Sequence, residues 1–170
     1  NNGFAEVIMH AAIKDAALFK ALEESDLKHF QKSKSSLQKL IQQNALIKTR
    51  VVMRDEFERG ERRLLNFGHT LGHALEKQYN LMHGEAVAIG MTYAAAVSAK
   101  YTGFKQVARL VLLIEKYGLP TSVGYDKKKT FEILLSDKKK DAGEINFVLL
   151  EKIGKAVSKK LTFEQLYNLL

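Results

Sequence analysis

Residues 84–101 read GEAVAIGMTYAAAVSAKY, and this stretch decides the fold. A helix drawn through it carries apolar side chains on nearly every side, and many of those side chains are small. A helix that is apolar all round is buried in a protein core or a membrane. No apolar run in the chain reaches the ~18 residues that a membrane span needs. The stretch therefore predicts a central buried helix with close neighbours.

Helical periodicity also dominates the segments on both sides of this stretch. Apolar positions recur at helical spacing over most of the chain, and a charged break interrupts them at residues 54–62. Gly118 and Pro120 stop one of the later helices. The additional helices that the pattern predicts lie at residues 4–23, 35–54, about 63–79, 104–117 and 128–136.

The C-terminal segment has strand-like patterning instead. Residues 145–150 (INFVLL) and 155–161 (KAVSKKL) are separated by EKIG, which indicates a small hairpin. Thr162 caps a last helix, with Glu164 near its first turn. The sequence therefore predicts a mainly α fold, a multihelical domain over residues 1–170 with one small β-hairpin near the C-terminus.

The composition limits the possible partners. The chain has a formal net charge of +8 and no cysteine, which excludes disulfides and thiolate metal sites. A basic balance favours anionic partners such as phosphorylated metabolites, nucleic acid or an acidic companion domain. We expect no nucleic-acid partner, because no basic motif has interleaved aromatic residues. We expect a cytoplasmic protein without a membrane partner.

His69 and His73 lie four residues apart in NFGHTLGHALE (66–76), so they share one helix face. Zinc-binding helices use this spacing, but the metalloprotease version needs glutamate directly after the first histidine. Thr70 occupies that position, so a metalloprotease is excluded. The spacing alone leaves two interpretations open: a metal or catalytic site, and a pair of packed histidines.

Two glycines and a third histidine lie close to this pair. Gly68 and Gly72 each cost a helix roughly 1 kcal/mol, which indicates that another helix or a ligand must approach closely. His83 begins the central helix, and a helix N-terminus disfavours a protonated imidazole. That position suits a neutral, metal-binding imidazole, although a histidine without a ligand remains an alternative.

Several motifs together resemble one family. The runs RRLLNFGHTLGHALE (62–76) and HGEAVAIGM (83–91) are similar to the signature of the 3-dehydroquinate synthases, the second enzyme of the shikimate pathway. Further matching stretches fall in the expected order along essentially the whole chain. They are GFAEVI (3–8), KTRVVMRDEFERGER (48–62), YGLPTS (117–122) and SDKKKDAGEINFVLLEKIGKA (136–156).

The resemblance implies an enzyme of two lobes, an N-terminal lobe that binds NAD and a mainly helical C-terminal lobe that holds the metal. This chain corresponds to the second lobe. Its start at Asn1 and its lack of a Gly-rich phosphate loop fit that expectation. We therefore expect the N-terminal NAD domain to be missing here and the chain alone to be inactive. The full-length enzyme is expected to be a homodimer.

The resemblance also implies a catalytic zinc, or cobalt in its place, held by Glu6, His69 and His83. Three nitrogen and oxygen ligands with one open position are usual for a catalytic zinc. His73 would then contact the reacting substrate or a bound water instead of the metal.

Five further positions match family residues that line the substrate cleft. Arg62 and Lys138 would pair with substrate anions, Arg62 in bidentate fashion. Asn66 would hydrogen-bond a hydroxyl or the phosphate, and Lys48 would act beside it. Glu58 would orient and balance these cations.

The implied reaction converts 3-deoxy-arabino-heptulosonate 7-phosphate to 3-dehydroquinate and phosphate. A ring hydroxyl is oxidised transiently by NAD, phosphate is eliminated and the hydride returns. Ring opening and an intramolecular aldol then close the carbocycle, so the enzyme is a carbon–oxygen lyase.

One position departs from the family pattern. The family usually has lysine where Met9 stands, one helical turn from Glu6, and Met9 cannot bind an anion. Either His10 or Lys14 compensates, or the residue is an alteration, or the substrate differs. A different substrate would indicate another sugar-phosphate cyclase of the same superfamily. More distant alternatives are a metal-dependent polyol dehydrogenase and a non-catalytic helical binding module.

Overall fold

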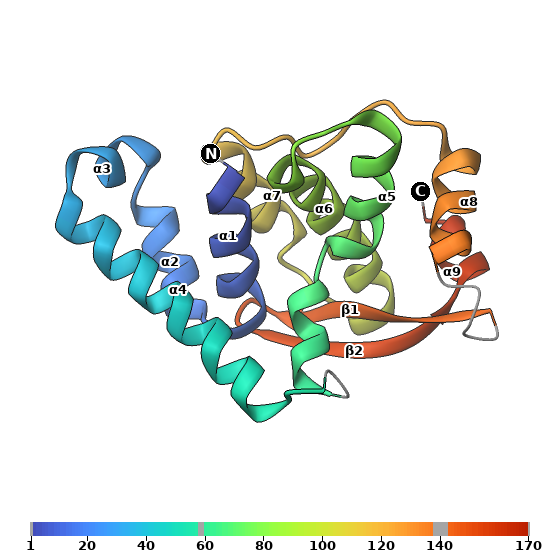
Figure 1. Ribbon diagram of the computed structural model, residues 1–170, viewed down its shortest axis with the longest axis horizontal. Coiled ribbons are helices and arrows are strands. Elements are labelled where there is room, and N and C mark those ends of the chain that lie inside the picture. Colours follow the sequence, from blue (N-terminus) through green and yellow to red (C-terminus); the bar gives the residue numbers. More distant parts are fainter. Residues whose placement is uncertain (1, 58–59, 138–142, 170) are drawn as a thin grey trace.

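The computed structural model describes residues 2–57, 60–137 and 143–169 (Figure 1). Helices make up most of this part of the chain, and one two-stranded sheet lies near the C-terminus, as the sequence predicts. The elements are α1 (Asn2–Lys14), α2 (Ala16–Glu24), α3 (Leu27–Lys32), α4 (Lys34–Arg54), the 3-10 helix η1 (Glu61–Asn66), α5 (His69–Tyr79), α6 (His83–Thr102), α7 (Val107–Lys116), α8 (Lys127–Asp137), β1 (Glu144–Lys152), β2 (Lys155–Thr162) and α9 (Phe163–Tyr167).

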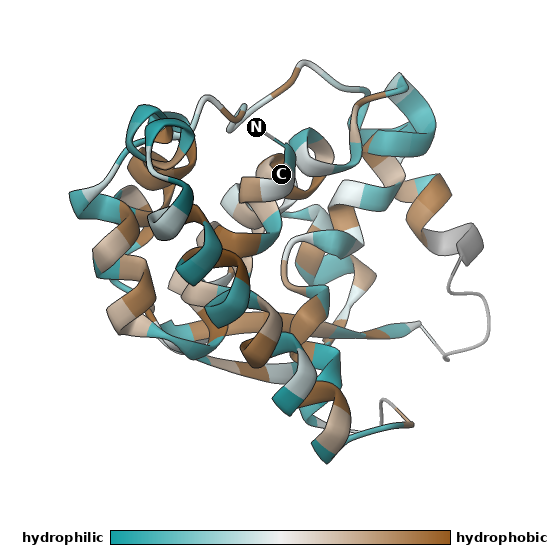
Figure 2. Cartoon of the chain, turned by 60° about the vertical axis from the view of Figure 1, so that its left-hand side comes forward, coloured by the Kyte–Doolittle hydropathy of each residue, from teal (hydrophilic) through white to brown (hydrophobic). Residues whose placement is uncertain are grey.

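Helix α6 is the centre of the core, which confirms the prediction for residues 84–101. It packs against α1, α5, α7 and β1, and both hydrophobic and hydrophilic residues alternate along the helices (Figure 2). Its small side chains, such as those of Ala88 and Ala94, are fully buried. Small residues on α6 let the neighbouring helices approach closely. Because of this close approach, the first turn of α5 lies near the first turn of α6.

Two expected helices are each divided in two. The helix predicted at 4–23 ends at Lys14, because Asp15 has an extended backbone and caps α2, accepting a hydrogen bond from the main-chain nitrogen of Leu18 at 2.9 Å. The helix predicted at about 63–79 breaks at Gly68, whose φ of 81° is left-handed. Gly68 therefore lies before α5 rather than inside it, and its expected cost within a helix does not arise.

The hairpin forms where the sequence predicts it. Strands β1 and β2 are antiparallel, with Ile145 opposite Leu161 and Leu150 opposite Ala156. The strands cross the lower half of the molecule in Figure 1, and the main-chain nitrogen of Leu150 donates to the Ser98 hydroxyl of α6 at 2.9 Å. This bond ties the sheet to the central helix.

Thr162 caps α9, as the sequence predicts. Its hydroxyl accepts a hydrogen bond from the main-chain nitrogen of Gln165 at 3.1 Å, and the Gln165 side chain accepts one from the nitrogen of Thr162 at 2.8 Å. The reciprocal partner is thus Gln165, and Glu164 lies in the first turn.

Helices α8 and α9 lie at one end of the molecule and α2, α3 and α4 at the other (Figure 1). Within the described residues, no helix combines the length and the apolar character that a membrane crossing requires.

Candidate metal and substrate site

The three predicted metal ligands converge from three helices. Glu6 lies on α1, while His69 and His83 are the first residues of α5 and α6. Nε2 of His69 lies 3.3 Å and Nε2 of His83 lies 3.8 Å from Oε1 of Glu6. One ligand atom from each residue lies within 4.8 Å of the other two, a spacing that can hold a metal ion.

Close packing of α5 against α6 sets the positions of both histidines. A Cβ on Gly90 would lie 1.9 Å from the carbonyl oxygen of Gly68, and one on Gly72 would lie 2.9 Å from that of Ala86. The neighbour for which Gly72 leaves room is therefore helix α6 and not a ligand. With no Cβ between them, the two helices bring His69 and His83 within reach of one carboxylate.

Hydrogen bonds at Nδ1 orient both His69 and His83. Nδ1 of His69 lies 3.3 Å from the carbonyl oxygen of Phe67, and Nδ1 of His83 lies 3.1 Å from Oε2 of Glu76. A proton on Nδ1 would be donated to each of these oxygens, which leaves the Nε2 lone pairs to face Glu6. Such outer hydrogen bonds fix the tautomer and the ring orientation of metal-binding histidines.

Glu76 was not among the predicted site residues. A signal for it was present, because Glu76 follows His73 by three residues and so lies on the same face of the helix. Its bond to His83 crosses from α5 to α6, and the sequence contains no direct sign of that contact.

The carboxylate of Glu6 suits a divalent cation. Its Oε1 is buried and makes no hydrogen bond to any described residue, although the Nε2 lone pair of His69 faces it. Burial alone would raise the pKa of Glu6, but a proton on His69, and then on His10 or His83, lowers it overall, which favours the carboxylate form. A cation between these atoms would satisfy an oxygen whose isolation is otherwise costly. Two histidines and one glutamate are a known ligand set of catalytic zinc, so the residues fit the metal.

His73 lies beside the two predicted ligand histidines. Its ring centroid is 5.3 Å from that of His69 and 6.0 Å from that of His83. Burial, followed by the charge of His69, lowers its pKa and favours a neutral imidazole. His73, Glu76 and His83 also meet the spacing for a metal ion. Because Glu76 already accepts from His83 and the buried, unpaired oxygen belongs to Glu6, the geometry favours the Glu6 group.

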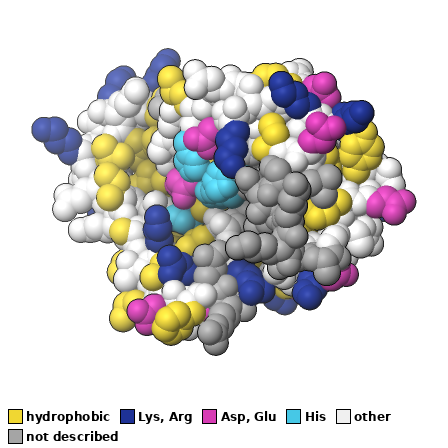
Figure 3. Space-filling view, turned by 45° about the vertical axis from the view of Figure 1, so that its right-hand side comes forward, with side chains coloured by type: hydrophobic (Ala, Val, Ile, Leu, Met, Phe, Trp, Pro, Cys, Tyr) yellow, Lys and Arg dark blue, Asp and Glu magenta, His cyan; other side chains and the backbone are white. Residues whose placement is uncertain are grey.

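A cavity of about 210 Å³ opens next to Glu6 and His69. It brings together Lys48 of α4 with Arg62 and Asn66 of η1, so three predicted cleft residues lie beside two predicted ligands. On the surface, histidines, carboxylates and basic side chains gather in the same region (Figure 3). The side chains that line the cavity are those of Glu6, His10, Lys48, Arg62, Leu65, Asn66 and His69.

Local hydrogen bonds hold Arg62 at the edge of this cavity. Its main-chain nitrogen donates to Oδ2 of Asp55 at 2.9 Å, and its guanidinium donates to the carbonyl oxygen of Glu56 at 2.7 Å. These bonds leave further guanidinium donors for an anion. The predicted residues Glu58 and Lys138 lie outside the described residues.

The surroundings of Met9 are apolar. Its side chain is 1 % exposed and belongs to the core. Of the two residues expected to compensate, Lys14 is ion-paired with Glu61, whereas His10 lines the cavity. Burial lowers the pKa of His10, which favours a neutral ring.

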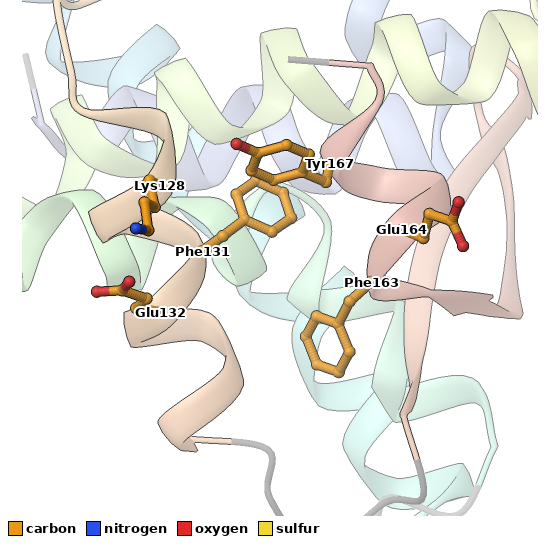
Figure 4. A pocket seen from close by; sticks show the side chains of 6 residues that line it. All are labelled: Lys128, Phe131, Glu132, Phe163, Glu164 and Tyr167. Atoms are coloured by element: carbon orange, nitrogen blue, oxygen red, sulfur yellow. The ribbon is translucent and has the colours of Figure 1, made fainter.

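A larger cavity of about 420 Å³ lies between α8 and α9. The rings of Phe131 and Tyr167 meet edge-on at 5.0 Å, and Phe163 lines the same space (Figure 4). This larger cavity is mostly apolar, and no predicted site residue lines it. The cavity at Glu6 is therefore the candidate active site.

A histidine–glutamate group beside a cavity with cationic side chains is an arrangement typical of metal-dependent enzymes that act on anionic substrates. The family model described as 3-dehydroquinate synthase C-terminal matches residues 3–140, and the chain belongs to this family.

Curated relatives carry the same family name. A 3-dehydroquinate synthase of Dehalococcoides mccartyi (strain BAV1) is 42 % identical over 160 residues, which cover 91 % of this chain and 45 % of that protein. The one of Pelobacter propionicus is 40 % identical over 173 residues, with 98 % and 48 % covered. The chain spans about half the length of the curated relatives that it matches.

Solved structures show the same fold. ValA, the 2-epi-5-epi-valiolone synthase of Streptomyces hygroscopicus with NAD+ and Zn2+ bound, matches with a TM-score of 0.82 at 23 % identity, covering 99 % of this chain and 49 % of that one. A 2-deoxy-scyllo-inosose synthase complexed with carbaglucose-6-phosphate, NAD+ and Co2+ matches with a TM-score of 0.79 at 22 % identity, covering 99 % and 49 %.

Proposed function

We propose that this chain is the metal- and substrate-binding part of a 3-dehydroquinate synthase, which converts 3-deoxy-arabino-heptulosonate 7-phosphate to 3-dehydroquinate and phosphate. The observation that carries the proposal is the convergence of Glu6, His69 and His83 at a cavity with cationic side chains. Curated synthases about 40 % identical to the chain support the same function.

Glu6, His69 and His83 would hold Zn2+ or Co2+, which would supply Lewis-acid polarisation of substrate oxygens. The chain's own residues would do the positioning. Lys48 and Arg62 would neutralise the phosphate and carboxylate, and the orientation of the substrate would come largely from these charges.

The polar groups around these cations would hydrogen-bond substrate hydroxyls and transfer protons. Asn66 would hydrogen-bond a hydroxyl or a phosphate oxygen at the cavity. His73, as a neutral imidazole next to His69, would accept and return a proton during oxidation or ring opening. Lys138 and Glu58 would complete the substrate-binding set.

The hydride carrier would bind mainly outside these residues. ValA, which has the same fold, was solved with NAD+ bound, and this chain covers 49 % of it. We propose accordingly that the chain needs an N-terminal NAD-binding domain for turnover, and that the complete enzyme is a cytoplasmic homodimer.

The test has two parts. Calorimetric titration with zinc should show one site in the unmodified chain, no binding in Glu6→Gln and His69→Ala, and nearly normal binding in His73→Ala. The chain joined to the NAD-binding half of the Dehalococcoides relative should release phosphate from the heptulosonate phosphate. Equal damage by His73→Ala and His69→Ala would show that the metal site is wrongly assigned.

A second candidate is another sugar-phosphate cyclase, which Met9 favours because the usual lysine is missing. The same joined protein would be assayed with heptulose and hexose phosphates. Phosphate release or ring closure with one of these, and none with the heptulosonate phosphate, would establish the second candidate instead.

A further inference from the structure

His10 is a buried residue with an unused hydrogen-bonding atom. It lies on α1 one turn after Glu6 and is 1 % exposed. Its Nε2 is buried and has no hydrogen-bond partner among the described residues, yet the side chain lines the cavity at Glu6. A buried polar atom without a partner is costly, so its position next to a substrate cavity indicates that a ligand completes it.

The other ring nitrogen determines what His10 can bind. Nδ1 lies 2.6 Å from Oδ1 of Asn44, on α4. An amide oxygen can only accept, so Nδ1 of the neutral ring carries the proton and donates it to Asn44. Nε2 then has a lone pair and no proton, so it can act only as an acceptor, in a ring that lines the cavity.

A second acceptor lies opposite. Oε2 of Glu6 is 4.0 Å from Nε2 of His10, too far for a hydrogen bond, and the two acceptors cannot bond to each other in any case. A hydroxyl has a single proton, so it can donate to Nε2 of His10 or to Oε2 of Glu6 but not to both, and a second O–H group would satisfy the other acceptor. A phosphate or carboxylate oxygen without a proton can donate to neither.

Lys48 and Arg62 line the same cavity as His10, so the cavity offers donors for an anion and an acceptor for a hydroxyl. A ligand that satisfies both kinds of group carries hydroxyl groups together with an anionic group.

We infer that Nε2 of His10, held as an acceptor by Asn44, binds a hydroxyl group of the polyol phosphate substrate beside the Glu6 carboxylate. This inference rests on the proposed function. It gives Asn44 a positioning role. It also adds a neutral hydrogen-bond acceptor to a site whose other substrate contacts are mainly made by charged side chains.

The test uses the zinc-loaded 170-residue chain and titrates it with 3-deoxy-arabino-heptulosonate 7-phosphate and with inorganic phosphate. His10→Phe should bind the sugar phosphate about tenfold more weakly, the cost of one lost hydrogen bond. Its affinities for inorganic phosphate and for zinc should stay within twofold of the unmodified chain. Asn44→Leu should weaken sugar-phosphate binding in the same direction by a smaller factor. His29→Phe, on the exposed surface of α3, is the matched control and should bind like the unmodified chain.

Analogues that each lack one hydroxyl identify the group that is bound. With one of them, His10→Phe should bind as well as the unmodified chain, because the interaction is already absent. Equal sugar-phosphate affinity in His10→Phe and the unmodified chain would overturn the inference and leave the proposed function intact.

Two other outcomes would also overturn it. If His10→Phe bound both zinc and the sugar phosphate more weakly, His10 would act only by orienting Glu6 through a bridging water and would not bind the substrate. If the unmodified chain bound zinc but no sugar phosphate, the proposed function would fail, and the inference would fail with it.

Discussion

Replacing Gly90 by alanine should force α5 and α6 apart. The added Cβ would lie 1.9 Å from the carbonyl oxygen of Gly68 and 3.0 Å from the main-chain nitrogen of Gly72. Because both contacts are main-chain atoms, no side-chain rotation relieves them, and the helices must separate by about 1 Å at this point. Overpacking of this kind costs about 3 kcal/mol, and the better helix propensity of alanine returns roughly 1 kcal/mol. We expect Gly90→Ala to lower the free energy of unfolding by about 2 kcal/mol or more.

Urea denaturation and thermal melting measure this loss. A change of about 2 kcal/mol corresponds to roughly 4–8 °C in Tm for a domain of this size. Gly124→Ala is the control, because no atom lies within 4 Å of a Cβ there, and its stability should be unchanged or slightly higher. The same separation moves His69 away from His83, so zinc affinity should fall in Gly90→Ala alone. If Gly90→Ala unfolded within about 0.5 kcal/mol of the unmodified chain, the close approach of the two helices would be refuted.

Three further predictions follow from local contacts. Asp15→Ala removes the cap of α2 and should cost about 1 kcal/mol in urea denaturation; no change would show that the cap is not needed to start α2. Glu76→Ala should weaken zinc binding about 10- to 100-fold by calorimetry, because the His83 ring loses its orienting partner, whereas Glu76→Gln, which keeps an acceptor oxygen, should lose less. Zinc at 100 times its Kd should stabilise the fold by about 2.7 kcal/mol, seen as a rise in Tm that chelation reverses and that His69→Ala abolishes; a similar rise in His69→Ala would place the ion elsewhere.

The sequence predicts the long-range plan of this fold well, because periodicity records which side of each helix is buried. The central helix, the hairpin and the cap at Thr162 all form where their patterns indicate. The breaks at Asp15 and Gly68 were missed for a physical reason: apolar spacing continues across both positions, while a single side-chain cap or one left-handed residue ends the helix.

The convergence of Glu6, His69 and His83 was predictable from the family resemblance but not from spacing. The interval between His69 and His73 correctly places both on one face, yet the placement of His83 beside Glu6 depends on how α1 and α6 pack beside α5. Glu76 was missed because its partner comes from another helix, whereas His10 was expected only as one of two residues that could compensate for Met9. For His10, the interval of four residues after Glu6 was the available signal.

The convergence of Glu6, His69 and His83 also bears on folding. His69 and His83 belong to consecutive helices, whereas Glu6 lies on α1, far earlier in the sequence. Because closing a long loop costs chain entropy, an ion bound by all three residues would require α1 to be docked. A bound ion would therefore link α1 to α5 and α6, and its dissociation rate would report how often α1 detaches.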